Sequence, residues 1–251
     1  LGTGENVGGR HVGIGKGVYV SYNGGKKWIN KGLKKSEHIS KIIIDNDDSN
    51  TVFVASQGPL WSSGGERGLY KTTNGGDSWK NVLVVDEWTG VTDIVVDPRD
   101  KKVMYAATWQ RHRNVAAYIG GGPGTSLYKS TDAGETWDKL SVGLPSGNMG
   151  KIGLAISSIN PDVLYAAIEL DRKKGAIYRS SDRGESWSKM SDTVSGGTGP
   201  HYYQELVASP HYFDKIYLMD VRVQVSDDGG KSFYTMNERS KHSDNHSMTF
   251  K

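Results

Sequence analysis

The sequence has 251 residues with no cysteine, and its 31 Lys and Arg residues against 28 Asp and Glu residues give a formal net charge of +3. The lack of cysteine excludes disulfides, thiolate metal sites and a thiol nucleophile, and the balanced charge argues against a nucleic-acid-binding surface. No apolar run reaches the roughly 18 residues that indicate a membrane-spanning helix, so no direct membrane span is expected.

An eight-residue phrase, Ser-x-Asp/Asn-x-Gly-x-Ser/Thr-Trp, recurs five times along the chain. The copies read SYNGGKKW, TTNGGDSW, STDAGETW, SSDRGESW and SDDGGKSF, and they end at Trp28, Trp79, Trp137, Trp187 and Phe233. Repeats spaced about 50 residues apart are typical of solenoids, propellers and arrays. The repeat therefore restricts the architecture more strongly than any single residue does.

The residue types of the phrase suit a turn between two strands. The acidic or amide side chains can accept hydrogen bonds from nearby backbone N–H groups, and the glycine permits a positive φ. These side chains are Asn23, Asn74, Asp132, Asp182 and Asp228. The closing aromatic ring can bury a large apolar area between neighbouring sheets. We therefore expect a structural role for the phrase and no catalytic one.

Apolar strand phrases fill the sequence between the copies, in the same order in each repeat. The first run of each repeat begins at Ile42, Asp93, Gly153 or Glu205, and the second begins at Thr51, Val103, Val163 or Ile216. A third run, such as GLYK before Thr72, leads directly into the repeated phrase. Short β-branched and aromatic runs bounded by Asn, Pro, Asp and Gly are strand signals. Together with the strand that follows the phrase, these runs predict four-stranded antiparallel propeller blades.

The predicted organisation is a single all-β domain over residues 1–251 that covers about five blades. A partial blade occupies residues 1–35, blades follow at about 36–86, 87–144, 145–194 and 195–240, and another blade begins at 241–251. Two arrangements remain open at this point. The segment is either the middle of a longer propeller or a five-bladed ring closed by its terminal strands.

The repeated phrase resembles the Asp-box (BNR) repeat. The phrases GTGEN from Gly2, GPLW and GGERGLYK from Gly58, and TWQRHR with GGGPG from Thr108 are similar to those of large bacterial Asp-box propellers related to the sortilin luminal domain. The resemblance covers essentially the whole chain. It implies seven or more blades, further blades or domains in a longer chain, and export to the periplasm or cell surface. Such proteins are often labelled glycosyl hydrolases, although Asp boxes lie on the structural underside of propellers with many different functions.

Ligand-binding groups are expected on the face opposite the Asp boxes, because loops on a rigid scaffold carry most binding residues. The loops on that face combine aromatic rings with polar groups, which suits a glycan, peptide or protein ligand. The candidates are Trp61, Arg67, Trp88, Trp109, Gln110, Arg111, Tyr202, Tyr203 and His246. The alternative is that these side chains pack against one another and fill the spaces in glycine-rich loops.

Catalysis by a glycoside hydrolase requires two facing carboxyl groups. The candidates by location are Glu5, Glu66 and Glu205, and none of them lies in a pattern that demands catalysis. A surface ion pair is the competing role for each. The Phe-Arg-Ile-Pro phrase of sialidases does not occur, so a sialidase is disfavoured.

A metal site has one weak signal. In an extended segment, His242, Asp244 and His246 would share one side, and histidine with carboxylate suits zinc or another divalent ion. The competing interpretation is a polar turn that enters a strand. No cofactor is predicted, because the glycine-rich stretch at 120–124 is not followed by a phosphate-binding motif.

Two functions remain after these exclusions. The first is an exported, sortilin-like propeller that binds a peptide, protein segment or glycan without turning it over. The second is a glycoside hydrolase that acts on a polysaccharide through paired carboxylates on the same face.

Overall fold

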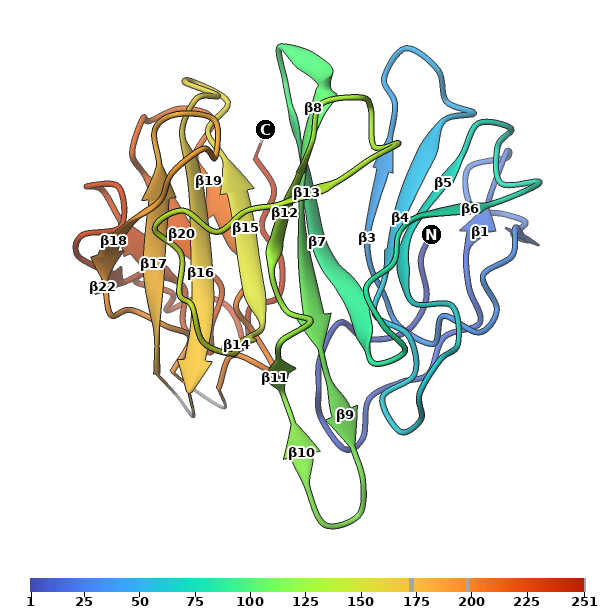
Figure 1. The fold of residues 1–251 in the computed structure, drawn as a ribbon, viewed down its shortest axis with the longest axis horizontal. Coiled ribbons are helices and arrows are strands. Elements are labelled where there is room, and N and C mark those ends of the chain that lie inside the picture. The colour runs from blue at the N-terminus through green and yellow to red at the C-terminus, as the bar shows by residue number, and fades with distance from the viewer. Residues whose placement is uncertain (172–173, 197–198, 251) are drawn as a thin grey trace.

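Four antiparallel sheets of four strands each make up most of the structure. The computed structural model describes residues 1–171, 174–196 and 199–250, and Figure 1 shows the first three sheets side by side in chain order. Each sheet is called a blade below and is numbered along the chain. In the described part of the chain, no helix is long and apolar enough to cross a bilayer.

The strand bounds of the blades are as follows. The first blade contains β3 (Ile39–Ile44), β4 (Val52–Ser56), β5 (Gly68–Thr72) and β6 (Lys80–Leu83). The second contains β7 (Thr89–Asp97), β8 (Asp100–Gln110), β12 (Leu127–Ser130) and β13 (Asp138–Lys139). The third contains β15 (Ile152–Ile156), β16 (Leu164–Asp171), β17 (Lys174–Ser180) and β18 (Ser188–Ser191). The fourth contains β19 (Leu206–Ala208), β20 (Ile216–Leu218), β21 (Gln224–Ser226) and β22 (Tyr234–Thr235).

Shorter elements complete the structure. A partial blade at the N-terminus contains β1 (Tyr19–Val20) and β2 (Ile29–Asn30), with an added bridge between Gly2 and Val18. The long connection after β8 forms the hairpin of β9 (His112–Arg113) and β10 (Tyr118–Ile119). It then continues into β11 (Gly121–Gly122), which pairs with β14 (Met149–Gly150).

Sequential strands are neighbours in every blade, so each blade is an antiparallel meander. The order is β3-β4-β5-β6 in the first blade, and the other blades repeat it. The repeated phrase lies between the third and fourth strands, as the sequence predicted. The prediction of an all-β propeller with four-stranded antiparallel blades and Asp-box turns is confirmed.

In the first three blades the second strand is buried on both faces, which explains its unbroken apolar run. In β4, Phe53 and Ala55 pack toward the second blade, whereas Val54 belongs to the cluster shared with the partial blade. In β8, Met104 faces the first blade and Tyr105 faces the third. A strand covered by neighbours on both sides has no solvent face, so it lacks the usual polar alternation. The blades therefore stack through these strands.

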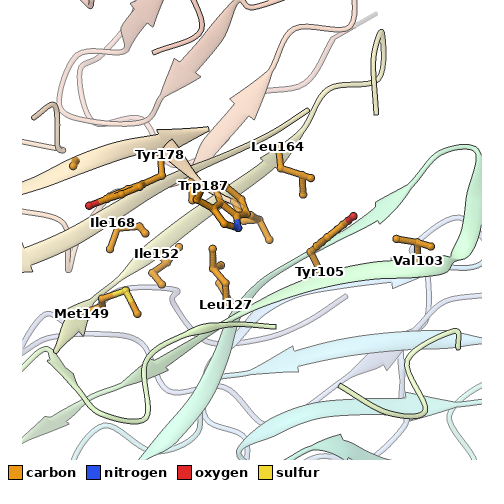
Figure 2. Close-up of a cluster of buried hydrophobic side chains, with 13 residues drawn as sticks. Val103, Tyr105, Leu127, Met149, Ile152, Leu164, Ile168, Tyr178 and Trp187 are labelled. Atoms are coloured by element: carbon orange, nitrogen blue, oxygen red, sulfur yellow. The ribbon is translucent and has the colours of Figure 1, made fainter. Parts of the chain in front are cut away.

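Figure 2 shows the largest blade-to-blade cluster, between the second and third blades. Tyr105 and Leu127 come from the second blade, and Leu164, Tyr178 and Trp187 come from the third. Burial of one such side chain contributes about 1.5–3 kcal/mol to the free energy of folding. The tyrosine also donates a hydrogen bond of 2.8 Å to the carbonyl of Arg183 in the neighbouring Asp box. Apolar burial and one directed bond thus join the two blades.

The Asp boxes share one hydrogen-bond pattern. In each copy, the Asp or Asn Oδ1 accepts the backbone N–H four residues later at 2.8–3.0 Å. The first residue of the phrase adds a bond that the sequence did not indicate, because its hydroxyl accepts the N–H of the glycine at 2.8–3.0 Å. Hydrogen bonds from Thr136 hold the pKa of Asp132 well below its usual range. The side chains therefore satisfy the inner N–H groups of the turn.

Two consecutive residues of each Asp box adopt a positive φ. The first is a glycine in three copies but Ala133 and Arg183 in the others, with φ of 61° and 60°. The second is always glycine, and in the last four copies its missing side chain makes room for the preceding blade. A Cβ on Gly134 would lie 2.7 Å from the ring of Phe53, and one on Gly230 would lie 2.6 Å from Ile177. Backbone conformation and blade contact both require glycine at this position.

The closing aromatic residues differ in burial. Trp187 is buried, whereas Trp79, Trp137 and Phe233 are half-buried. Trp28 is 47% exposed and lines a hollow beside Leu1. Burial between sheets, which the sequence suggested for all five, is therefore complete only at Trp187.

We expect Gly134→Ala to reduce the free energy of unfolding by about 3 kcal/mol, because it combines a strained φ with a collision against Phe53. Gly75→Ala is the matched control, since Gly75 has φ +66° and its Cβ would lie 3.3 Å from Asn50 Oδ1. The control is expected to lose about 1 kcal/mol. Urea unfolding followed by tryptophan fluorescence measures both, and equal losses would contradict the role of the blade contact.

Candidate functional site

The loops between second and third strands and the connections between blades lie on the face opposite the Asp boxes. This arrangement follows from the meander, in which alternate connections leave opposite ends of a blade. In Figure 1 the β9–β10 hairpin projects from this end of the second blade, away from the turn between β7 and β8. We call this end of the molecule the loop face.

A cavity of about 520 Å³ lies where the first strands of the blades meet. Its walls come from β3, β7, β15 and β19, the N-terminal loop and residues 246–248. The lining residues that carry charge or an aromatic ring are Glu5, Lys41, Asp93, Lys151, Tyr202, Glu205 and His246. The volume falls within the range of small-ligand sites. We call it the axial cavity, because the first strands surround it.

Asp93 joins three blades on one wall of the axial cavity. Its Oδ1 lies 2.6 Å from Lys41 Nζ of the first blade and accepts the N–H of Ile94 at 2.8 Å. Its Oδ2 accepts the N–H of Leu154 in the third blade at 3.0 Å. The carboxylate is therefore held from both oxygens, and Lys41 is presented in a fixed position.

Lys151, Glu205 and Asn6 form a second network at the cavity. The Lys151 side chain is only 2% exposed, and its Nζ lies 2.7 Å from Glu205 Oε1 and 3.0 Å from the Asn6 carbonyl. Asn6 Nδ2 also donates to Glu205 Oε1 at 3.0 Å. Because a buried ammonium needs such partners, the network fixes the N-terminal loop against the fourth blade.

The three carboxylates considered for catalysis are not gathered together. Glu5 and Glu205 line the axial cavity, whereas Glu66 is not among its lining residues. Glu5 Oε2 accepts the N–H of Gly13 at 2.8 Å, and Glu66 Oε2 accepts the N–H of Lys35 at 2.6 Å. Only Glu5 and Glu205 therefore share a possible site.

A row of aromatic rings leads from the β9–β10 hairpin to the axial cavity. Tyr118 lies 5.3 Å from His201, which lies 5.7 Å from Tyr202, measured between ring centroids. Tyr203 is buried, stacks on exposed His246 at 4.9 Å and donates to Asp244 Oδ1 at 2.6 Å. Of the predicted aromatic ligand residues, the structure thus brings Tyr202 and His246 to the axial cavity.

Trp109 and Arg111 do not face solvent, in contrast to the expectation from the sequence. Trp109 lies at the end of β8, is fully buried and donates from Nε1 to the Gly120 carbonyl at 2.9 Å. Arg111 is also fully buried, and its guanidinium donates to the carbonyls of Val7 at 2.7 Å and Gly58 at 3.2 Å. Burial lowers its pKa to about 9. These side chains hold loops together from inside.

Arg111 is directed inward because the surrounding loop carbonyls need hydrogen-bond donors. Glycine-rich loops leave many carbonyl groups without a strand partner, and a guanidinium offers five donors in a fixed plane. Arg67 is likewise buried and donates to carbonyls of its own loop, including that of Gln57 at 2.7 Å. Burial lowers its pKa to about 10.

The remaining predicted ligand residues lie on the loop face outside the cavity lining. Trp61 is 45% exposed, and half-buried Trp88 lies 4.3 Å from the ring of His112. Gln110 is held by the N–H of Gly124, which donates to its Oε1 at 2.9 Å.

The three metal candidates are not arranged as ligands. His242 Nδ1 lies 3.8 Å from Asp244 Oδ2, while the ring of His246 stacks on Tyr203. Among the described residues, no group of three or more His, Cys, Asp or Glu side chains is placed to hold a metal ion.

Sequence reasoning missed Lys41 and Lys151 as cavity residues. A signal for both of them existed in the first-strand phrases. Lys41 interrupts the apolar run HISKIII, and Lys151 precedes IGLAI. A lone charge in a strand that lines the propeller axis indicates a side chain directed at that axis.

His38 is a buried titratable group between the loops of this face. Its Nδ1 lies 3.0 Å from the Glu5 carbonyl, which assigns the proton of the neutral ring to Nδ1. Nε2 is buried and has no hydrogen-bond partner among the described residues. Burial, followed by the charge of Arg111, lowers the His38 pKa to about 4. The folded state therefore requires the neutral ring.

We expect stability to fall between pH 6.5 and 4, because the unfolded chain binds a proton at His38 that the folded chain excludes. The slope is about 1.4 kcal/mol per pH unit, or about 2 kcal/mol at pH 5 relative to pH 7. His38→Asn, which keeps a donor near the Glu5 carbonyl, should lose this part of the pH dependence. Urea unfolding at both pH values measures it, with exposed His242→Asn as the control. An unchanged pH dependence in His38→Asn would contradict the assignment.

Similar proteins of known structure share the propeller architecture. The chain matches a GH74 enzyme from Niastella koreensis at 16% identity and a TM-score of 0.64, covering 85% of this chain and 33% of the enzyme. It matches the GH74 xyloglucanase from Xanthomonas campestris at 18% identity and a TM-score of 0.65, covering 86% and 34%. An ancestral GH74 enzyme matches at 18% identity and a TM-score of 0.66, covering 96% and 30%.

The chain spans about a third of the length of these GH74 structures. At such low identity, the likeness shows the fold alone. No curated protein matches the sequence.

Part of the chain matches the model of a known protein family. Residues 16–149 match the model Sortilin-Vps10, described as sortilin, neurotensin receptor 3. This range includes the first three Asp boxes and the loops that carry Trp61 and Trp109. Because the match covers more than half of the 251 residues, the chain belongs to the Sortilin-Vps10 family.

Proposed function

We propose that this chain is part of an exported propeller that binds a peptide, protein segment or glycan on the loop face, with the axial cavity as the primary site. Membership of the Sortilin-Vps10 family supports a binding role. Export is proposed from the resemblance to exported bacterial Asp-box propellers. The observation that carries the proposal is the cavity itself, in which charged and aromatic side chains from four blades converge.

The cavity offers both donors and acceptors in fixed positions. Lys41 and Lys151 provide ammonium groups, Glu5 and Glu205 provide carboxylates, and His246 adds an exposed ring. The lysines are already ordered by Asp93 and Glu205, at 2.6 and 2.7 Å. A preorganised site loses less side-chain entropy when a ligand binds. This supports recognition of a polar ligand.

Hydrolysis is the second candidate, supported by Glu5 and Glu205 on one cavity and by the likeness to GH74 folds. The bonds of these carboxylates favour binding instead. Glu205 is ion-paired with a buried lysine, and Glu5 accepts a backbone N–H. A general acid or nucleophile needs a carboxyl group that can reach the reacting bond.

The test compares two histidines close together in sequence. We expect His246→Ala to weaken the affinity for a cavity ligand about tenfold, because His246 lines the cavity, whereas exposed His242→Ala should leave it unchanged. Isothermal titration calorimetry with a xyloglucan oligosaccharide and with a neurotensin peptide measures the binding. The oligosaccharide corresponds to the substrate in the name of the GH74 xyloglucanase. The peptide corresponds to the ligand in the name neurotensin receptor 3.

Reducing-sugar release from the oligosaccharide distinguishes the second candidate. Turnover that is lost in Glu205→Gln would favour the hydrolase. Equal affinities of the two histidine variants, or no binding of either probe, would contradict the proposed site.

A further inference from the structure

Trp61 stands on a loop that a single buried guanidinium holds from inside. Arg67 donates to the carbonyls of Gln57 at 2.7 Å, Ser62 at 2.7 Å and Gly64 at 2.9 Å, and also to the carbonyl of Pro59. These carbonyls lie on both sides of Trp61 in sequence. The backbone that presents the exposed ring is therefore fixed by hydrogen bonds on either side.

Trp88 and His112 lie beside this loop. The Trp88 carbonyl accepts bonds from Arg67 Nη1 at 3.4 Å and from the Arg111 N–H at 3.3 Å, so Trp88 shares its anchors with the Trp61 loop. The Arg113 N–H donates to the carbonyl of Leu60, which immediately precedes Trp61, at 2.9 Å. His112 lies between Arg111 and Arg113 in sequence, and its ring centroid is 4.3 Å from that of Trp88. We call Trp61, Trp88 and His112 the aromatic platform.

The strand register of the β9–β10 hairpin directs His112 outward. Across the β9–β10 hairpin, Arg113 pairs with Tyr118 and His112 pairs with Ile119. Arg113 and Tyr118 face the interior, where the guanidinium lies 4.5 Å from the tyrosine ring. Alternate strand residues point to opposite sides, so His112 and Ile119 face away from the interior. Ile119 is 49% exposed, which agrees with this orientation.

The charges around the platform favour an uncharged ligand. Asp86 and Glu87, which precede Trp88, are both exposed, and they would repel an anion while accepting hydrogen bonds from hydroxyl groups. The guanidiniums of Arg67, Arg111 and Arg113 are directed at carbonyl groups below the surface. They do not offer a charge pair to an anionic ligand.

The platform residues are exposed or half-buried, and they line neither the axial cavity nor the hollow beside Trp28. A protein partner usually anchors itself by filling a pocket with a buried side chain. A sugar ring needs only a flat aromatic face and nearby hydrogen-bond acceptors.

We propose that the aromatic platform binds a neutral polysaccharide chain by stacking sugar rings on Trp61 and Trp88, with Asp86 and Glu87 accepting hydroxyl hydrogen bonds. The inference rests on the proposed function, because it concerns the same loop face. It goes further by naming the ligand class and by assigning a contact surface outside the axial cavity.

The test uses affinity electrophoresis of the protein in gels that contain neutral galactomannan, neutral hydroxyethylcellulose or anionic polygalacturonate. Trp61→Ala and Trp88→Ala are each expected to weaken binding to at least one neutral polymer about tenfold. Trp28→Ala is the matched control, because Trp28 is 47% exposed against 45% for Trp61 but lies in an Asp box on the opposite face. The control should retain the parent affinity.

His246→Ala separates this inference from the proposed cavity site. Neutral polymer binding that survives His246→Ala and is lost in the platform variants supports the platform. Binding lost only in His246→Ala overturns the platform and leaves the proposed function standing. Binding of polygalacturonate or the neurotensin peptide without any neutral polymer overturns the ligand class alone. Binding of none of the probes overturns both proposals.

Discussion

The structure depends on burial of the second strands of the first three blades between neighbouring blades. Phe53 and Ala55 contact the following blade while Val54 contacts the preceding one, and β8 and β16 repeat this two-sided packing. Because neither face of such a strand is solvated, the blade cannot bury its apolar surface alone. The first strands are then held in place around the axis, and the loop face is built on their ends.

The two faces solve the same backbone problem in different ways. On one face, short Asp and Asn side chains accept N–H groups of the tight Asp-box turns. On the loop face, buried arginines donate to loop carbonyls, while Glu5, Glu66 and Gln110 accept backbone N–H groups. The loop face thus adds long donor side chains to the kind of acceptor that the Asp-box turns also use. The polar residues that remain directed at the axial cavity or at solvent are those free to contact a ligand.

The repeat allowed the fold to be predicted, because each Asp box is a local structure whose residue types follow from its own hydrogen bonds. The candidate site was harder, because burial on the loop face depends on how three distant loops pack. Trp61 and Trp109 occupy comparable places in sequence, yet one is 45% exposed and the other is fully buried at the end of β8. Arg111 reaches the carbonyl of Val7, a contact that no local pattern encodes. Lys41 and Lys151 carried a readable signal, a charge within or directly before an apolar strand.

The bridge of Asn6, Lys151 and Glu205 has a mechanical consequence. Asn6 and Glu205 are 199 positions apart in sequence, and their bond joins the N-terminal loop to the residue that precedes β19, beside the axial cavity. In an open array, each unit touches only its neighbours, so an end unit can detach while the others stay folded. Here Asn6 adds a contact that skips the intervening blades, so local opening of the N-terminal loop also removes hydrogen bonds from Glu205 and from buried Lys151. Local unfolding on one side of this contact is thereby coupled to the other side.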